Sequence, residues 1–185
     1  MKRSLLEDKC FSMPHDELWV EAYRRWFASV GMAEEIIKPA IECVGNHPFK
    51  HLFWSRTEEG TKPMLDWFRE RGYKLGVISN AEGQIQKLLD HIGITDRFDV
   101  VIDSGLVGFA KPDKRIFQKA MTEIGSSAES CIHVGDLLDI DVLGARSVGI
   151  TPILVDKDGD HPEVNCLSVN RVVELPKLSL FTEGE

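Results

Sequence analysis

Residues 130–149 of the chain read SCIHVGDLLDIDVLGARSVG, and the fold class follows from this segment. A short apolar run ends at Gly135, three carboxylates follow over 136–141, and an apolar helical pattern begins among them. A strand that turns directly into a helix is the repeating unit of α/β proteins. The segment therefore predicts a strand over 130–136 and a helix over 139–149.

Similar units lie on both sides of this segment. Apolar runs predict strands over 74–79, 98–104 and 151–156, with a last one over 171–175, and helical periodicity predicts helices over 61–72, 82–93 and 114–125. In the first of these helices, Thr61 is expected to be the cap and Met64, Leu65 and Phe68 the inner face. Near-continuous apolar strands that alternate with helices predict an α/β, Rossmann-like parallel sheet with helices on both faces.

The N-terminal part of the chain has a different pattern. Residues 14–46 predict two helices separated near Gly31, and Pro39 is expected to kink or break the second one. We therefore divide the chain into an N-terminal helical segment, 1–56, and a core, 57–185.

Composition and charge exclude several classes of protein. With 185 residues, 43% of them hydrophobic, the chain can bury the core of one ordinary domain. A net charge of −8 argues against a nucleic-acid partner, and no apolar run is long enough to span a membrane. The four cysteines are far apart, and the N-terminus has no signal-peptide core, so we expect a reduced, cytoplasmic protein.

Ligands of parallel sheets bind beyond the carboxyl ends of the strands, so the residues there are the candidates for a site. Ser79 and Asn80 follow the strand at 74–79, where the hydroxyl could donate to an anion beside free N–H groups of a helix starting near Glu82. Lys111 precedes Pro112, which restricts its backbone. Each feature alone is more often a plain turn or a surface lysine.

Three carboxylates lie in the turn after the strand at 130–136. Asp136, Asp139 and Asp141 would repel one another unless a cation lay between them, and an all-oxygen site suits Mg²⁺. Asp139 could instead cap the following helix, and Asp141 could interact with the dipole of that helix. Together with Ser79 and Lys111, however, the carboxylates form an ordered set, each at a strand end.

The segments VISN (77–80), AKPDKRIF (110–117) and HVGDLLDIDVLGA (133–145) resemble motifs II, III and IV of the haloacid dehalogenase superfamily, in the branch with a helical cap. The similarity covers roughly residues 60–156, and residues 14–56 resemble the tail half of such a cap. Most members of this family are Mg²⁺-dependent phosphohydrolases, and a minority are dehalogenases or phosphonatases.

The resemblance implies a role for each matching residue. Ser79, with Asn80 beside it, would hold the transferring phosphoryl group, and Lys111 would neutralise its charge. Asp136 would bind Mg²⁺, and Asp141 would complete or support the metal shell, with Asp139 in a supporting role only.

The first motif of the family, a strand ending in Asp-x-Asp-x-Thr that carries the nucleophile, does not occur in the 185 residues. In the resembling fold this strand lies between those at 74–79 and 130–136, so its absence would leave two inner strand edges unpaired. Three explanations stay open: a fragment or mis-started reading frame, which we favour; a shortened form that rearranges or dimerises; and a binding module that has lost catalysis.

These observations predict a lineage function of Mg²⁺-dependent hydrolysis of a small phosphorylated metabolite through an aspartyl-phosphate. The chain alone is expected to be inactive, because it lacks the nucleophile. The alternatives are a non-catalytic protein that binds phosphate or a partner, and a 2-haloacid dehalogenase lineage. A third option is self-association, through the unfilled sheet or through the exposed cap remnant around Trp19, Trp26 and Trp54.

Overall fold

The computed structural model describes residues 15–46 and 55–182. The chain divides into two compact units, Met1–Phe53 and Trp54–Glu185, and each is described by itself. The sequence-based boundary of 56/57 between cap and core remains a prediction.

The first unit contains two helices, α1 (His15–Ser29) and α2 (Glu34–Asn46), which contact each other. Among the residues of this unit whose burial is described, Phe27 and Ile37 are buried. The helix α2 is continuous across Pro39, so the expected break is wrong. Pro39 lies on the exposed side, where water can bind the carbonyl that the missing N–H leaves free. Trp26 is exposed, whereas Trp54 and the side chain of Trp19 lie outside the described residues.

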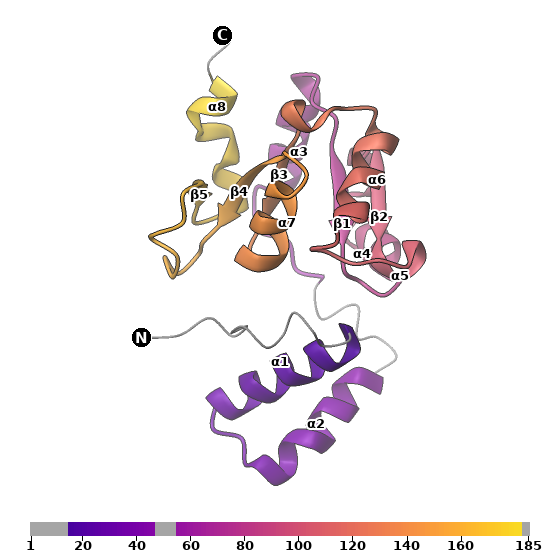
Figure 1. The fold of residues 1–185 in the computed structure, drawn as a ribbon, viewed down its shortest axis with the longest axis vertical. Coiled ribbons are helices and arrows are strands. Elements are labelled where there is room, and N and C mark those ends of the chain that lie inside the picture. Colours follow the sequence, from indigo (N-terminus) through magenta and orange to yellow (C-terminus); the bar gives the residue numbers. More distant parts are fainter. Residues whose placement is uncertain (1–14, 47–54, 183–185) are drawn as a thin grey trace. The chain divides into compact units, whose positions relative to one another are not determined.

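The second unit contains two parallel sheets, as Figure 1 shows. Strands β1 (Gly76–Ser79) and β2 (Val100–Asp103) form one of them. The other has the order β3 (Ile132–Gly135), β4 (Thr151–Val155) and β5 (Leu167–Val169). Among the described residues, no ladder joins β1 to β3.

Helices follow the strands and cover them. Their bounds are α3 (Thr61–Glu70), α4 (Ile85–Ile92), α5 (Ser104–Val107), α6 (Lys114–Ile124), α7 (Leu143–Arg146) and α8 (Ser179–Thr182), with short 3-10 turns η3 (Thr95–Arg97), η4 (Ala128–Ser130) and η6 (Val172–Lys177). The helix predicted over 139–149 begins as a π-turn, η5 (Leu138–Val142), which leads into α7.

Two hydrophobic clusters lie on opposite faces of the strands. Met64, Leu65 and Phe68 of α3 belong to the first cluster, which includes α4 residues and contacts Val77 of β1. The second cluster contains buried residues of β2, α6 and α7, and Ile78 of β1 packs against it. Since Val77 and Ile78 are consecutive, they point to opposite faces. The α/β, Rossmann-like fold with helices on both faces is therefore confirmed.

Three local predictions are wrong. Residues 171–175 form no strand but lie largely in η6, where Glu174 accepts a hydrogen bond from the Arg171 N–H, and the last strand is β5 instead. Thr61 is not the cap of α3; Gly60 is, and the Thr61 hydroxyl donates to the Glu58 carbonyl at 2.7 Å. The inner face of α3, however, is buried as predicted.

The third correction concerns the loop after β1. The helix there begins at Ile85, because Glu82 and Gly83 both have positive φ angles, 51° and 82°, which interrupt a right-handed helix. No helix in the described ranges is long and apolar enough to cross a membrane.

Candidate active site

The candidate residues at the ends of β1 and β3 are linked through Lys111. Asn80, directly after β1, makes two hydrogen bonds to the Lys111 backbone: its amide nitrogen donates to the carbonyl at 3.0 Å, and its oxygen accepts from the N–H at 2.9 Å. The Lys111 ammonium in turn donates to Asp141 Oδ1 at 2.7 Å. The side chain of Asn80 therefore positions the backbone of Lys111, and the Asp141 carboxylate binds the ammonium group of Lys111.

Asp141 is the most constrained of the predicted residues. Its side chain is 3% exposed, and it folds back against the end of β3, where a Cβ at Gly135 would overlap it. His133 Nε2 lies 3.0 Å from Oδ1, and the Leu137 N–H donates to Oδ2 at 3.1 Å. Both carboxylate oxygens are therefore hydrogen-bonded within the chain.

The charge state of Asp141 follows from these contacts. Burial by itself would raise the pKa of this carboxyl, but the hydrogen bond from His133 and the positive charge and hydrogen bond of Lys111 outweigh it and lower the pKa to about 2. An ionised carboxylate only accepts hydrogen bonds, so His133 must carry a proton on Nε2. The ring of His133 also packs edge-on against Phe117, with the ring centroids 5.1 Å apart.

Asp136, Asp139 and Ser79 stand outside this network. Asp136 is exposed and Asp139 is half-buried, and no hydrogen bond of either carboxylate is found within the described residues. The N-cap of η5 is Leu137, so the alternative role of Asp139 as a cap is wrong. Ser79 is half-buried at the end of β1, on the same edge of the sheet as Lys111.

Two of the N–H groups expected near an anion beside Ser79 are already occupied. Asp103, at the end of β2, is 2% exposed and accepts hydrogen bonds from Gly83 N at 2.6 Å and from Ile85 N at 2.9 Å. It also accepts from Gly105 N at 2.9 Å. The N–H groups of Gly83 and Ile85 are therefore not free to bind an anion. Asp103 uses them to fix the loop, a role that no local pattern of residues indicated.

The predicted Mg²⁺ pair does not form a complete metal site. Over residues 15–46 and 55–182, no three His, Cys, Asp or Glu side chains lie together in a way that could hold a metal ion. Asp141 already accepts hydrogen bonds from Lys111, His133 and Leu137. Asp136, by contrast, is exposed. Since Mg²⁺ usually keeps water and takes one or two carboxylates, these residues supply only part of such a site.

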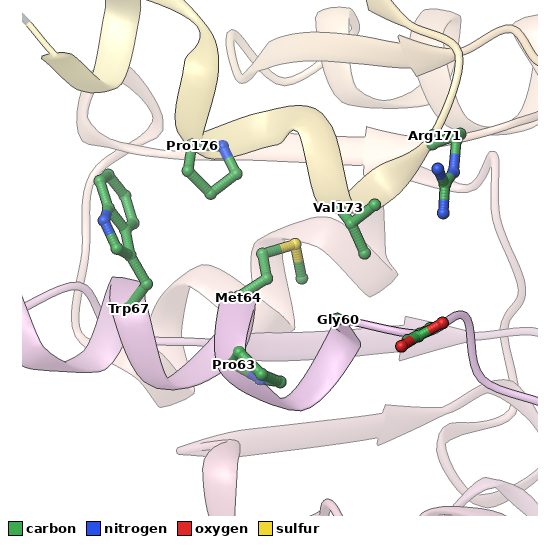
Figure 2. Close-up of a pocket in the computed structure, with 8 residues that line it drawn as sticks. Gly60, Pro63, Met64, Trp67, Arg171, Val173 and Pro176 are labelled. Carbon is green, nitrogen blue, oxygen red and sulfur yellow. The ribbon is translucent and has the colours of Figure 1, made fainter.

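A pocket in the described part of the chain lies away from these residues. It has a volume of about 480 Å³ and lies between α3 and η6. Figure 2 shows Pro63, Met64 and Trp67 of α3 facing Val173 and Pro176 of η6 across it. None of the predicted site residues lines this pocket, so it is unrelated to the Lys111 network.

Comparison with known proteins finds relatives that are hydrolases, among them phosphatases. Residues 16–149 match the family of haloacid dehalogenase-like hydrolases. The chain is 38% identical to glyceraldehyde 3-phosphate phosphatase of Methanothermobacter thermautotrophicus over 146 residues, which are 75% of this chain and 64% of the relative. It is 31% identical to phosphoserine phosphatase of Thermus thermophilus over 155 residues, 78% of this chain and 61% of the relative.

Solved structures agree in fold. The HAD-hydrolase YfnB of Bacillus subtilis, solved bound to magnesium, superposes with a TM-score of 0.68 at 20% identity, over 92% of this chain and 73% of that one. A HAD phosphatase of Thermococcus onnurineus gives 0.65 at 24% identity, over 88% of both chains. The chain spans 55 to 64% of the length of the first curated relatives that it matches.

Proposed function

The chain belongs to the haloacid dehalogenase-like hydrolase family, and on this basis we propose that its lineage function is Mg²⁺-dependent hydrolysis of a small phosphorylated metabolite. The observation that carries this proposal is the Lys111–Asp141 pair at the carboxyl ends of β1 and β3. A half-buried ammonium held in place by a buried carboxylate is suited to stabilising the negative charge of a phosphoryl group during transfer. The two phosphatase relatives support the same reading.

In this proposal the residues have positioning, phosphate-binding and metal-binding roles. Asn80 fixes the backbone of Lys111, and Asp141 and His133 fix the direction of its ammonium. The Ser79 hydroxyl, on the same edge, can donate to a phosphate oxygen. Asp136 supplies one carboxylate toward Mg²⁺.

The chain of 185 residues is expected to turn over nothing by itself. Phosphoryl transfer through an aspartyl-phosphate needs a carboxylate that attacks phosphorus, and neither Asp136 nor Asp141 stands in an Asp-x-Asp-x-Thr sequence. Lys111 and Mg²⁺ can stabilise charge but cannot replace that nucleophile. In this proposal the nucleophile strand also brings the remaining metal ligands.

The test compares two proteins in a phosphate-release assay with p-nitrophenyl phosphate and Mg²⁺. The chain alone should release no phosphate above background. A fusion that adds a strand ending in Asp-x-Asp-x-Thr should release phosphate in a Mg²⁺-dependent manner, and either Lys111→Met or Asp136→Ala should lower the rate by about 10²-fold or more. Lys114→Met, a change to an exposed lysine nearby, is the matched control. A fusion that folds but releases no phosphate would refute the proposal.

Two further outcomes separate the alternatives. Metal-dependent turnover by the chain alone, abolished by Asp136→Ala, would show that it needs no added nucleophile. Turnover of a 2-haloacid by the fusion without Mg²⁺ would favour a dehalogenase. If phosphate binds the chain with Mg²⁺ and the fusion stays inactive, a phosphate-binding role replaces the catalytic one.

A further inference from the structure

The pocket of about 480 Å³ between α3 and η6, called the α3–η6 groove below, has a largely apolar lining. Five apolar side chains line it: Pro63, Met64 and Trp67 of α3, and Val173 and Pro176 of η6. Only Met64 is buried, at 7% exposure, and the other four are half-buried or exposed. A cleft of this size that is lined mainly by apolar and aromatic side chains is typical of a binding site.

One end of the α3–η6 groove is polar. Glu59 and Arg171 line this end, and both are exposed. In Figure 2, Arg171 lies at the opposite end of the groove from Trp67. Arg171 donates from Nε to Glu58 and from its backbone N–H to Glu174. The carboxylate of Glu59, by contrast, has no hydrogen bond or ion pair within the described residues.

Negative charge predominates at this end. Three carboxylates raise the pKa of the Arg171 guanidinium: Glu58, by a hydrogen bond and by its charge, and Glu174 and Glu59, by their charges. Lys157 adds a second cation, in the neighbouring cavity that Glu58 and Arg171 also line. Three carboxylates therefore face two cations, and Glu59 is the carboxylate that no cation binds. A cationic group of a ligand would be attracted to this end of the groove.

The other end of the groove carries a positive charge. The Arg71 guanidinium lies 3.9 Å from the centroid of the Trp67 ring, so it covers one face of the indole. This charge disfavours a second cation beside Trp67, whereas the part of the indole that lines the groove offers an apolar surface. A ligand that is apolar along most of its length and basic at one end therefore has one preferred placement, with its basic end at Glu59.

The walls of the groove also select the backbone of the ligand. α3 and η6 are both helical, so most of their N–H and C=O groups bond within each segment, and a β-strand would find no ladder partner. A polyproline II segment needs no such partner, because its backbone stays hydrated while its prolyl rings pack on aromatic and apolar side chains. From Gly60 to Trp67 the groove follows α3 for about 10 Å. Three or four residues in polyproline II conformation, which rises about 3.1 Å per residue, span that length.

We propose that the α3–η6 groove binds a proline-rich segment of another protein, with the prolines against Trp67 and a basic residue against Glu59. The eight prolines of the chain are at least nine positions apart, so a second copy of the 185 residues cannot supply such a segment. The proposal is independent of the proposed hydrolase function, because no residue of the Lys111 network lines the groove.

The experiment measures the binding of dye-labelled peptides to the full 185-residue chain by fluorescence anisotropy. Because no ladder fixes the direction of the bound segment, two probes are used: Ala-Pro-Pro-Leu-Pro-Ala-Arg and the same residues in reverse order. Control peptides carry alanine in place of the prolines, or glutamate in place of the arginine. The protein variants are Trp67→Ala, Glu59→Gln and Glu59→Arg. Glu163→Gln changes an exposed carboxylate outside the groove and is the matched control.

At least one arginine peptide should bind with a dissociation constant below about 100 μM. The alanine peptide should bind at least about tenfold more weakly, because it loses the prolyl contacts and its flexible chain must be ordered. Glu59→Gln should weaken binding by about threefold, as expected for an exposed ion pair, and Glu163→Gln should not. Trp67→Ala should weaken it by at least about tenfold. Glu59→Arg should reverse the preference, so that the glutamate peptide binds more tightly than the arginine peptide.

The proposal would be overturned if neither arginine peptide binds, if the alanine peptide binds equally well, or if Glu59→Gln and Glu163→Gln have the same effect. If Trp67→Ala proves unfolded in urea titrations, the charge reversal at Glu59 still decides, because this residue is exposed. An unchanged preference in Glu59→Arg would then refute the placement of the basic residue. Self-association of the chain in sedimentation that Glu59→Arg abolishes, without peptide binding, would make a second copy the occupant and also overturn the proposal.

Discussion

Asp141→Asn is the substitution that tests the candidate site most directly, because the carboxylate is nearly fully buried and receives three donors. Lys111 and His133 donate to Oδ1, and the Leu137 N–H donates to Oδ2. An Asn side chain has one oxygen and one NH₂ group, so whichever way the amide turns, a donor faces a donor. The change also leaves the half-buried Lys111 charge without its partner.

The magnitude follows from the lowered pKa. The pKa of Asp141 falls from 3.8 to about 2, and at about 1.36 kcal/mol per pH unit this corresponds to about 2 kcal/mol of stability. Removing one partner of a buried ion pair costs about 3–5 kcal/mol. We therefore expect Asp141→Asn to lower the free energy of unfolding by about 3 kcal/mol at pH 7. With a urea m-value of about 2 kcal/mol/M, the midpoint would fall by about 1.5 M.

The loss should depend on pH. The pKa in the folded state lies below the value in the unfolded state, so the contribution of the carboxylate is fully present above about pH 4 and is lost as the pH falls toward 2. Urea midpoints of wild type and variant should therefore differ clearly at pH 7 and converge below pH 4. The matched control is Asp139→Asn, which changes a half-buried carboxylate two residues away.

The reasoning would be wrong if the midpoints of wild type and Asp141→Asn agree within about 0.2 M at pH 7. It would also be wrong if Asp139→Asn causes the same loss. A difference that stays constant down to pH 3 would show that the charge of Asp141 is not what stabilises the fold.

Two further changes test the supports of the site by thermal or urea unfolding. Asp103→Asn should lower the free energy of unfolding by about 2 kcal/mol, because a buried acceptor of three N–H donors gains an NH₂ group. Asp113→Asn changes a partly exposed N-cap, which Asn can still provide, and should have little effect; equal losses would contradict this. Gly135→Ala should destabilise by about 2 kcal/mol or more, because its Cβ would lie 2.6 Å from Asp141 Oδ2 and overlap the carbons of that side chain. Gly45→Ala, in a helix with open space around it, should be neutral or slightly stabilising, and a neutral Gly135→Ala would refute the close approach.

Local patterns predicted most of the secondary structure of the second unit. The strands predicted at 74–79, 98–104, 130–136 and 151–156 contain β1 to β4. A short apolar run bounded by turns is typical of a strand that is covered by helices on both faces. The apolar run at 171–175 failed as a strand: Pro176 lies in the same turn, and Glu174 closes it through a side-chain hydrogen bond. β5, with three residues, is too short to give a periodic signal.

The sequence by itself determined the family, the fold class and the edge of the sheet at which the site lies. Motif order places Asn80 directly after a strand and Lys111 and Asp141 in the segments that follow two other strands, and the carboxyl ends of parallel strands lie at one edge of the sheet. Only the tertiary structure decided how these residues pair. The roles of Asp103 and His133 depend on donors 18 to 20 residues away and on a carboxylate 8 residues away, respectively.

For the unpaired edges of β1 and β3, too, the sequence determines one part and the tertiary structure another. That the nucleophile strand is absent from the 185 residues is a property of the sequence. That β1 and β3 are less buried than the strands outside them, while Lys111 still joins their ends, depends on how the helices pack on each sheet. Burial and hydrogen-bond geometry arise between segments far apart in the chain, so no local pattern of residues specifies them.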